Sequence, residues 1–142
     1  MTAKEYLNQI RRNRLHQKIL LEKIEELNTQ AQGLKAITYD KDRIQVSPSN
    51  KLEEYMVRIT VLAEKYARNV LRYEALENKI RGQIQAMPND AQMEVLMLRY
   101  VETDENGRQM TFERIACILH KSFDWVCHLH GYALKEFERR YL

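Results

Sequence analysis

The stretch TFERIACILHKSFDWV, from Thr111 to Val126, predicts two helices joined by a short turn. The hydroxyls of Thr111 and Ser122 suit the position before a helix, where a side-chain oxygen accepts a hydrogen bond from a first-turn N–H group. Ala116 is small enough to let the two helices cross closely. Apolar anchors on both helices would hold that crossing together, namely Ile115, Leu119 and Val126. The pattern is typical of a helix-turn-helix.

The second of these helices is expected to run from Phe123 to Arg140 and to divide into two faces. One face should turn inward, with Val126, His130, Ala133, Leu134 and Phe137. The other would enter the major groove of DNA. Together with its flanking residues, it supplies the predicted DNA-binding set: Lys121, Ser122, Phe123, Trp125, Cys127, His128, Lys135 and Arg139. Trp125 could equally pack half-buried at the start of the helix.

Upstream of the quoted stretch, residues 87–90 (MPND) interrupt the helical pattern and supply cap residues for a further helix over 91–101. The polar segment 102–109 contains an Asn-Gly turn signal and predicts a small hairpin or a loop. Residues 87–142 are therefore expected to form one helical domain.

Several pieces of this domain resemble region 4 of bacterial sigma factors. The pieces are EVLMLRY at 94–100, TFERIACIL at 111–119, SFDWV at 122–126 and the pair Ala133-Leu134. They occur in the same order over roughly 55 of the 142 residues. With a long helical region in front of it, the chain is similar to phage and prophage transcriptional regulators of the RinA/ArpU type. The resemblance implies that the protein binds double-stranded DNA and that RNA polymerase is a possible second partner. It also implies a location in the bacterial cytoplasm and a gene of the bacterial host or of a prophage.

Residues 1–86 are expected to form a helical arm. The first helix is expected at about 2–32. Its predicted seam follows the 4-3-4-3 spacing of a helix pair, with Leu20, Ile24, Leu27, Ala31 and Leu34. Gly33 is a plausible stop signal for that helix, and residues 33–49 are predicted as a loop with a short extended piece at 44–46. From Asn50 a second helix holds heptad spacing to Met87. Such a long seam must be buried, either by an antiparallel coiled-coil hairpin or by a second copy of the chain in a homodimer.

The distribution of charge keeps a second hypothesis open. Residues 1–86 carry 16 basic and 11 acidic side chains, whereas residues 87–142 carry 7 basic and 9 acidic ones. DNA-binding modules are usually basic, so the acidic balance favours an alternative: a non-enzymatic helical adaptor whose degenerate helix-turn-helix binds protein. The one concentrated basic patch is Arg11, Arg12, Arg14 and Lys18, which suits phosphate, an acidic partner or simply a solvated face.

The remaining motifs predict an all-α protein without catalysis, cofactor or metal. Cys117-x2-His120 and Cys127-x2-His130 could suggest zinc, but their separation matches no common zinc motif. The two cysteines are expected to be free thiols in a reducing cytoplasm. No Gly-rich phosphate loop or nucleophile motif is present, and no apolar run is long enough for a membrane span.

Overall fold

The structure is a computed structural model that describes residues 1–40 and 48–142. Within these ranges the chain belongs to the all-α class, and no named strand is present. None of the described helices combines the length and the apolar character that crossing a bilayer requires. The elements in chain order are α1 (Ala3–Leu7), α2 (Gln9–Asp40), α3 (Pro48–Gln85), α4 (Asp90–Leu96), η1 (Met97–Val101), α5 (Phe112–Leu119) and α6 (Phe123–Tyr141).

The first predicted helix differs from the structure at two points. It is interrupted at Asn8, which separates α1 from α2. The predicted stop at Gly33 is wrong, because α2 continues to Asp40. Gly33 does not have the positive φ of a helix-ending glycine, and glycine inside a helix costs only about 1 kcal/mol. Residues 41–47 of the predicted loop, including the extended piece expected at 44–46, lie outside the described residues.

The second long helix begins two residues before the predicted Asn50. Proline is well suited to the first position of a helix, because its missing N–H has no partner there and its φ is already helical. That property accounts for a start at Pro48. The helix ends at Gln85, ahead of the break predicted at 87–90.

By contacts the chain divides into two compact units. Unit 1 comprises residues 1–14 and 73–142, and unit 2 comprises residues 15–72. This division differs from the boundary expected at 86/87, since unit 1 takes residues from both predicted domains. Each long helix therefore contributes one end to unit 1 and its remaining described turns to unit 2.

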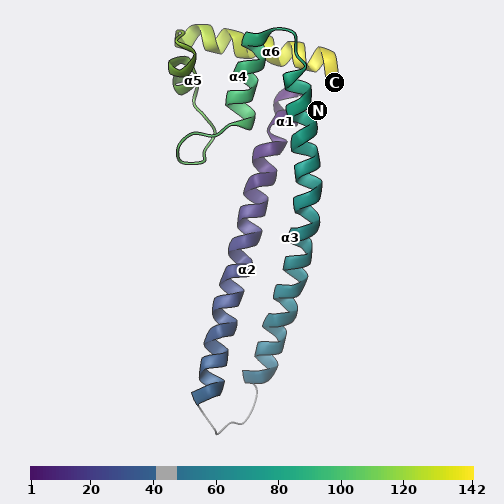
Figure 1. Cartoon of the computed structure of the whole chain (residues 1–142), viewed down its shortest axis with the longest axis vertical. Coiled ribbons are helices and arrows are strands. Elements are labelled where there is room, and N and C mark those ends of the chain that lie inside the picture. The colour runs from purple at the N-terminus through teal and green to yellow at the C-terminus, as the bar shows by residue number, and fades with distance from the viewer. Residues whose placement is uncertain (41–47) are drawn as a thin grey trace. The chain divides into compact units, whose positions relative to one another are not determined.

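Unit 1 has a core built from both ends of the chain. Its larger cluster joins Leu7 and Ile10 to Ile80 and Ile84 of α3 and to Phe137 of α6, all of them almost completely buried. A second cluster gathers around α5 and comprises Val95, Met110, Ile115, Ala116 and Val126. Helix α6 packs against α1, α4 and α5, and Figure 1 shows it lying across α4. The core therefore holds α6 by one face only.

In unit 2, parts of α2 and α3 lie side by side (Figure 1). The predicted seam residues Leu20, Leu27 and Ala31 are buried. The Gln17 side chain donates a hydrogen bond to the Tyr66 carbonyl at 3.4 Å. Asn69 is also buried, at 8% exposure, and its Nδ2 has no hydrogen-bond partner among the described residues. The seam is thus apolar with a polar layer at Gln17 and Asn69.

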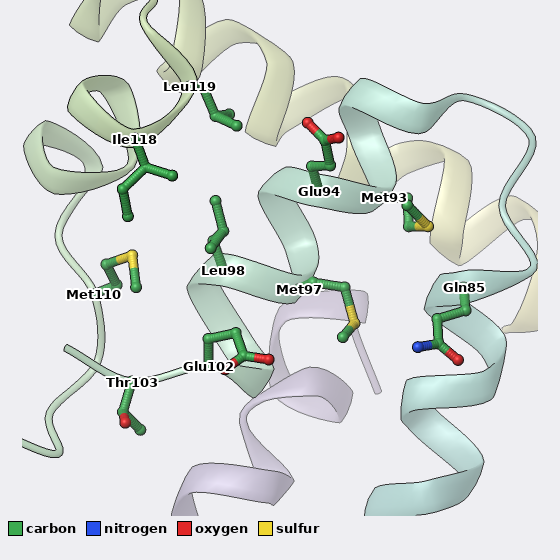
Figure 2. A pocket seen from close by; sticks show the side chains of 10 residues that line it. All are labelled: Gln85, Met93, Glu94, Met97, Leu98, Glu102, Thr103, Met110, Ile118 and Leu119. Atoms are coloured by element: carbon green, nitrogen blue, oxygen red, sulfur yellow. The ribbon is translucent and has the colours of Figure 1, made fainter.

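The helix predicted over 91–101 changes its winding partway. After Leu96 the chain adopts a π-helical turn, η1, closed by a hydrogen bond from the Glu102 amide to the Met97 carbonyl at 2.8 Å. Side chains of Met97 and Leu98 leave this segment toward the same hollow (Figure 2). The following residues form a tight turn at Gly107, whose φ is 74°, next to an isolated antiparallel bridge between Thr103 and Gln109.

Candidate nucleic-acid interface

Helices α5 and α6 are joined by a tightly bonded turn. Thr111 caps α5, and Ser122 caps α6 by accepting a hydrogen bond from the Trp125 amide at 3.1 Å. Between them His120 adopts the left-handed conformation, with φ of 56°. The Lys121 amide donates to the Ala116 carbonyl at 3.0 Å, which satisfies a carbonyl at the end of α5. Local hydrogen bonds therefore set where α6 starts.

The structure leaves most of the predicted DNA-binding residues accessible. Phe123 and Trp125 are 45% and 37% exposed, large values for aromatic side chains. Cys127 is half-buried, so it is the least accessible of the predicted set. The other members are exposed, namely Lys121, Ser122, His128, Lys135 and Arg139.

One face of α6 combines aromatic and basic side chains. Trp125, His128, Tyr132 and Lys135 follow helical spacing of three and four residues, and all four are exposed. We call them the outer face of α6. They lie opposite the buried Val126, Ala133 and Phe137.

The sequence interpretation missed Tyr132, which is 61% exposed and central to the outer face. Its position seven residues after Trp125 and four after His128 was the available signal. Exposed tyrosine is common, so the spacing alone did not separate it from other surface residues. The neighbouring Gly131 has open space where a Cβ would lie.

Two contacts orient the start of the outer face. The Lys121 ammonium lies 5.2 Å from the centre of the Trp125 ring, within the range of a cation–π interaction. His128 Nδ1 lies 2.7 Å from the Asp124 carbonyl and can donate a hydrogen bond to it.

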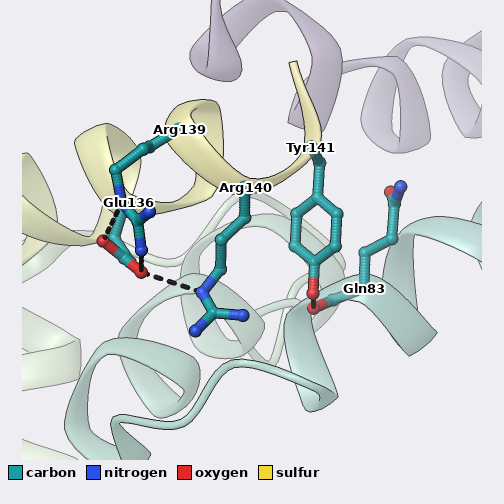
Figure 3. Close-up of polar contacts among 5 residues, drawn as sticks. All are labelled: Gln83, Glu136, Arg139, Arg140 and Tyr141. Carbon is teal, nitrogen blue, oxygen red and sulfur yellow. Dashed lines mark hydrogen bonds and ion pairs between the residues drawn. The ribbon is translucent and has the colours of Figure 1, made fainter.

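Near the end of α6, the two arginines are engaged by their own helix (Figure 3). Arg139 and Arg140 both donate to Glu136, at distances of 2.7 Å and 2.8 Å to Oε1. The hydrogen bonds from Arg139 and then Arg140 lower the pKa of Glu136 to about 2. The Tyr141 hydroxyl donates to the Gln83 carbonyl and ties this end of α6 to α3. Lys135, by contrast, makes no ion pair with a described residue, so it has the more available charge.

Behind the outer face, a polar and aromatic cluster supports α6. The Tyr100 hydroxyl and Nε2 of His130 share a hydrogen bond of 2.7 Å, and burial raises the pKa of Tyr100 to about 12. Burial, followed by the charges of Arg99 and Lys4, lowers the pKa of His130 to about 4. The Arg99 guanidinium lies 4.2 Å from the Phe112 ring centre and donates to the Met110 carbonyl at 2.6 Å. His130 therefore lies on the inward side of α6, as predicted, and its contacts with Tyr100 and Phe112 hold the helix against the cluster.

The predicted basic patch is divided by its contacts. Arg14 donates to the Val101 carbonyl at 2.8 Å and pairs with Glu77, so it joins α2 to η1 and α3. Arg11 and Arg12 remain exposed. Burial lowers the pKa of Arg99, and the charge of Arg11 lowers it further. The same charge opposes the burial that raises the pKa of Tyr100. Positive charge from the first turn of α2 thus reaches the cluster behind α6.

Among the described residues, no group of three or more His, Cys, Asp and Glu side chains is arranged to hold a metal ion. Cys117 and Cys127 are free thiols. His130 of the second Cys-x2-His pair is bonded to Tyr100 instead. No family model, curated protein or solved structure matches this chain.

Proposed function

We propose that the chain is a DNA-binding transcriptional regulator in which α5 and α6 act as a helix-turn-helix similar to sigma region 4. The observation that carries the proposal is the outer face of α6, where exposed aromatic and basic side chains lie on a helix held by its opposite face. A rigidly held helix of this kind can enter the major groove and contact base edges. In this proposal, Lys121 and Lys135 bind phosphate, while Trp125 and Tyr132 contact bases or sugars.

The acidic balance of residues 87–142 is the main argument against DNA binding. Residues 1–14 offset it within unit 1, because they carry Lys4, Arg11, Arg12 and Arg14 against a single carboxylate, Glu5. Electrostatic attraction to phosphate depends on the whole surface near the DNA and not on one segment. We therefore assign part of the DNA affinity to α1 and the start of α2.

The proposal gives the long helices a role in assembly. They are taken to form an antiparallel hairpin, which the hydrogen bond from Gln17 to the Tyr66 carbonyl and the buried leucines support. Exposed apolar side chains on their outward faces, such as Ile19, Val57 and Val61, favour association with a second copy. Contact with RNA polymerase and a location in the bacterial cytoplasm remain predictions.

The test is binding of a fluorescent DNA duplex to the full chain, measured by anisotropy over a range of salt concentrations. Lys121→Ala combined with Lys135→Ala should weaken binding and reduce the slope of log affinity against log salt by about two, since each phosphate contact contributes about 0.9. The matched control is Lys23→Ala with Lys65→Ala on the long helices, which should leave the slope unchanged. Trp125→Ala and Tyr132→Ala should weaken binding with little change of slope.

A different outcome would favour the alternative function, the non-enzymatic adaptor that binds protein. The acidic excess in residues 87–142 is the observation on its side. If the full chain fails to bind duplex DNA at about 50 mM salt, or binds it with no salt dependence, DNA recognition by α6 is excluded.

A further inference from the structure

Unit 1 contains an open groove of about 600 Å³ that the outer face of α6 does not share (Figure 2). Its lining comes from the end of α3, from α4 and η1, from residues 102–110 and from α5. No residue of α6 contributes to it. The groove is therefore separate in composition from the proposed DNA-binding surface.

The walls of the groove are apolar and rich in methionine. Met93, Met97 and Met110 line it together with Leu98, Ile118 and Leu119. Ile118 is 39% exposed, so an apolar side chain of α5 stands open to solvent beside the groove. Methionine side chains are flexible and polarizable, and surfaces rich in them adapt to apolar side chains of a docking helix.

The polar residues at the groove include two carboxylates and no positive charge. Figure 2 shows Glu94 near one end of the labelled apolar side chains and Glu102 near the other. Both are exposed, and neither forms an ion pair within the described part of the chain. Unpaired carboxylates at both ends favour an occupant with positive charge on either side of an apolar segment.

The backbone beneath the groove is irregular. Met97 and Leu98 belong to the π-helical η1, a winding that is rare and frequently found at functional sites. The bond from the Glu102 amide to the Met97 carbonyl places an acidic residue directly after this turn. The same local distortion thus carries part of the apolar wall and one of the two carboxylates.

We propose that this groove binds an amphipathic helix of a partner protein, with apolar residues at positions i, i+4 and i+7 and with Lys or Arg at both flanks. The apolar residues would contact the methionines and Ile118, and the flanking charges would pair with Glu94 and Glu102. This inference does not rest on the proposed DNA function, because it uses other residues. It also assigns a binding role to two of the acidic residues in the segment 87–142, Glu94 and Glu102.

The test uses a fluorescent synthetic helical peptide of about 18 residues, roughly five turns. It has Leu at the three apolar positions and Lys at the flanks. A second peptide carries Glu in place of every Lys. The full chain should bind the Lys peptide, and the Glu peptide should bind about tenfold more weakly, a difference that corresponds to about 1.4 kcal/mol. Equal binding of the two peptides, or no binding of either, would overturn the proposal.

Variants of the chain locate the binding. Ile118→Glu should weaken binding of the Lys peptide about tenfold. Glu94→Lys with Glu102→Lys should reverse the preference in favour of the Glu peptide. Controls of the same chemistry on α3 are Leu71→Glu and the pair Glu64→Lys with Glu74→Lys, which should change neither affinity. Unchanged binding in the groove variants, with circular dichroism confirming that they are folded, would overturn the assignment.

Methyl NMR of the methionines provides a readout that does not depend on variants. Addition of the Lys peptide should shift the signals of Met93, Met97 and Met110 and leave that of Met56 in place. Shifts confined to Met56 would contradict a site in this groove. A dimer that Ile118→Glu dissociates, with no peptide binding, would assign the groove to a second copy of the chain and overturn the proposal.

The two functions fail separately. Lys121→Ala with Lys135→Ala should leave peptide affinity unchanged, and Ile118→Glu should leave DNA affinity unchanged. Loss of DNA binding alone therefore leaves the groove proposal standing, and loss of peptide binding alone leaves the DNA proposal standing.

Discussion

His130 illustrates how burial changes the chemistry of a single residue. On sequence it is one of four histidines and belongs to a pair with zinc-like spacing. In the fold its ring is hydrogen-bonded to the Tyr100 hydroxyl and lies beside Phe112, with 4.8 Å between the ring centres. Burial, then Arg99 and Lys4, holds it neutral. Its residue type was visible in the sequence, but its protonation state depends on neighbours that are distant along the chain.

The lowered pKa of His130 predicts a pH-dependent stability. Above its ordinary pKa of 6.5 the residue is neutral in the folded and unfolded chain. As pH falls from about 6.5 to about 4, the unfolded chain binds a proton that the folded chain does not, so stability is lost over that window. His130→Gln should flatten this dependence, because glutamine does not titrate. Urea unfolding at several pH values, from neutral pH down through the window between about 6.5 and about 4, would measure it.

The control for that experiment is His128→Gln on the exposed side of α6, which should keep the wild-type pH dependence. An equally steep dependence in His130→Gln would show that other groups are responsible. Glu136 is not one of these groups, because its pKa is lowered from 4.5 to about 2 and its contribution is lost only below the pH range that is measured.

At the scale of one helix, α6 contains a glycine that nothing in unit 1 requires. Gly131 has a helical backbone and open space around the position of a Cβ. Glycine in the interior of a helix is about 1 kcal/mol less favourable than alanine. A compensating role outside the folded chain, such as close approach of a DNA backbone next to Tyr132, would account for its presence.

Gly131→Ala should therefore raise the free energy of unfolding by about 1 kcal/mol and weaken DNA binding. Gly82→Ala in α3 is the matched control, since Gly82 also has open space. It should be stabilising to a similar extent with no effect on DNA affinity. Thermal unfolding and DNA anisotropy measure the two effects. If Gly131→Ala bound DNA as tightly as the wild type, the backbone of α6 would not approach DNA at this point.

Helix α3 carries a polar residue within its apolar seam. Asn69 is buried, and its Nδ2 has no partner in the described residues. An unsatisfied buried polar group costs about 1–3 kcal/mol, so Asn69→Leu should stabilise the chain by about that amount. Asn78→Leu on the exposed side of the same helix should have little effect. Urea unfolding compares them, and a destabilised Asn69→Leu would show that the amide has an interaction essential to the seam.

At the scale of the whole molecule, unit 1 depends on both chain termini. Ala3, Leu7 and Ile10 complete a core whose other members lie on α3, on the segment 87–101 and on α6. Removing one such leucine typically costs 2–5 kcal/mol, a large part of the stability of a small domain. The predicted C-terminal domain therefore lacks part of its core when it is separated from residues 1–86.

A fragment of residues 87–142 should accordingly show no cooperative thermal transition by circular dichroism. A single chain that joins residues 1–14 to residues 73–142 through a short Gly-Ser linker should unfold cooperatively, because it restores unit 1. Cooperative unfolding of the 87–142 fragment at the temperature of the full chain would contradict the shared core.

The sequence alone determined much of the local structure. Thr111, Asn89 and Ser122 cap the helices they were expected to cap, because a cap depends on hydrogen bonds within a few residues. Periodicity correctly predicted the buried Val126, Ala133 and Phe137, since one helical face has to meet the core. The exposure of Lys135 on the opposite face followed from the same reasoning.

Only the tertiary structure decided which segments share a core and which surfaces remain open. Leu7, Ile84 and Phe137 belong to one buried cluster although they are far apart in the chain, and no local pattern encodes that grouping. The π-helical turn at Met97–Val101 was likewise predicted as part of an α-helix, because the spacing of its apolar residues is almost that of an α-helix. The groove beside it exists because α4, η1 and α5 leave a gap between them, and such a gap is a property of packing rather than of sequence.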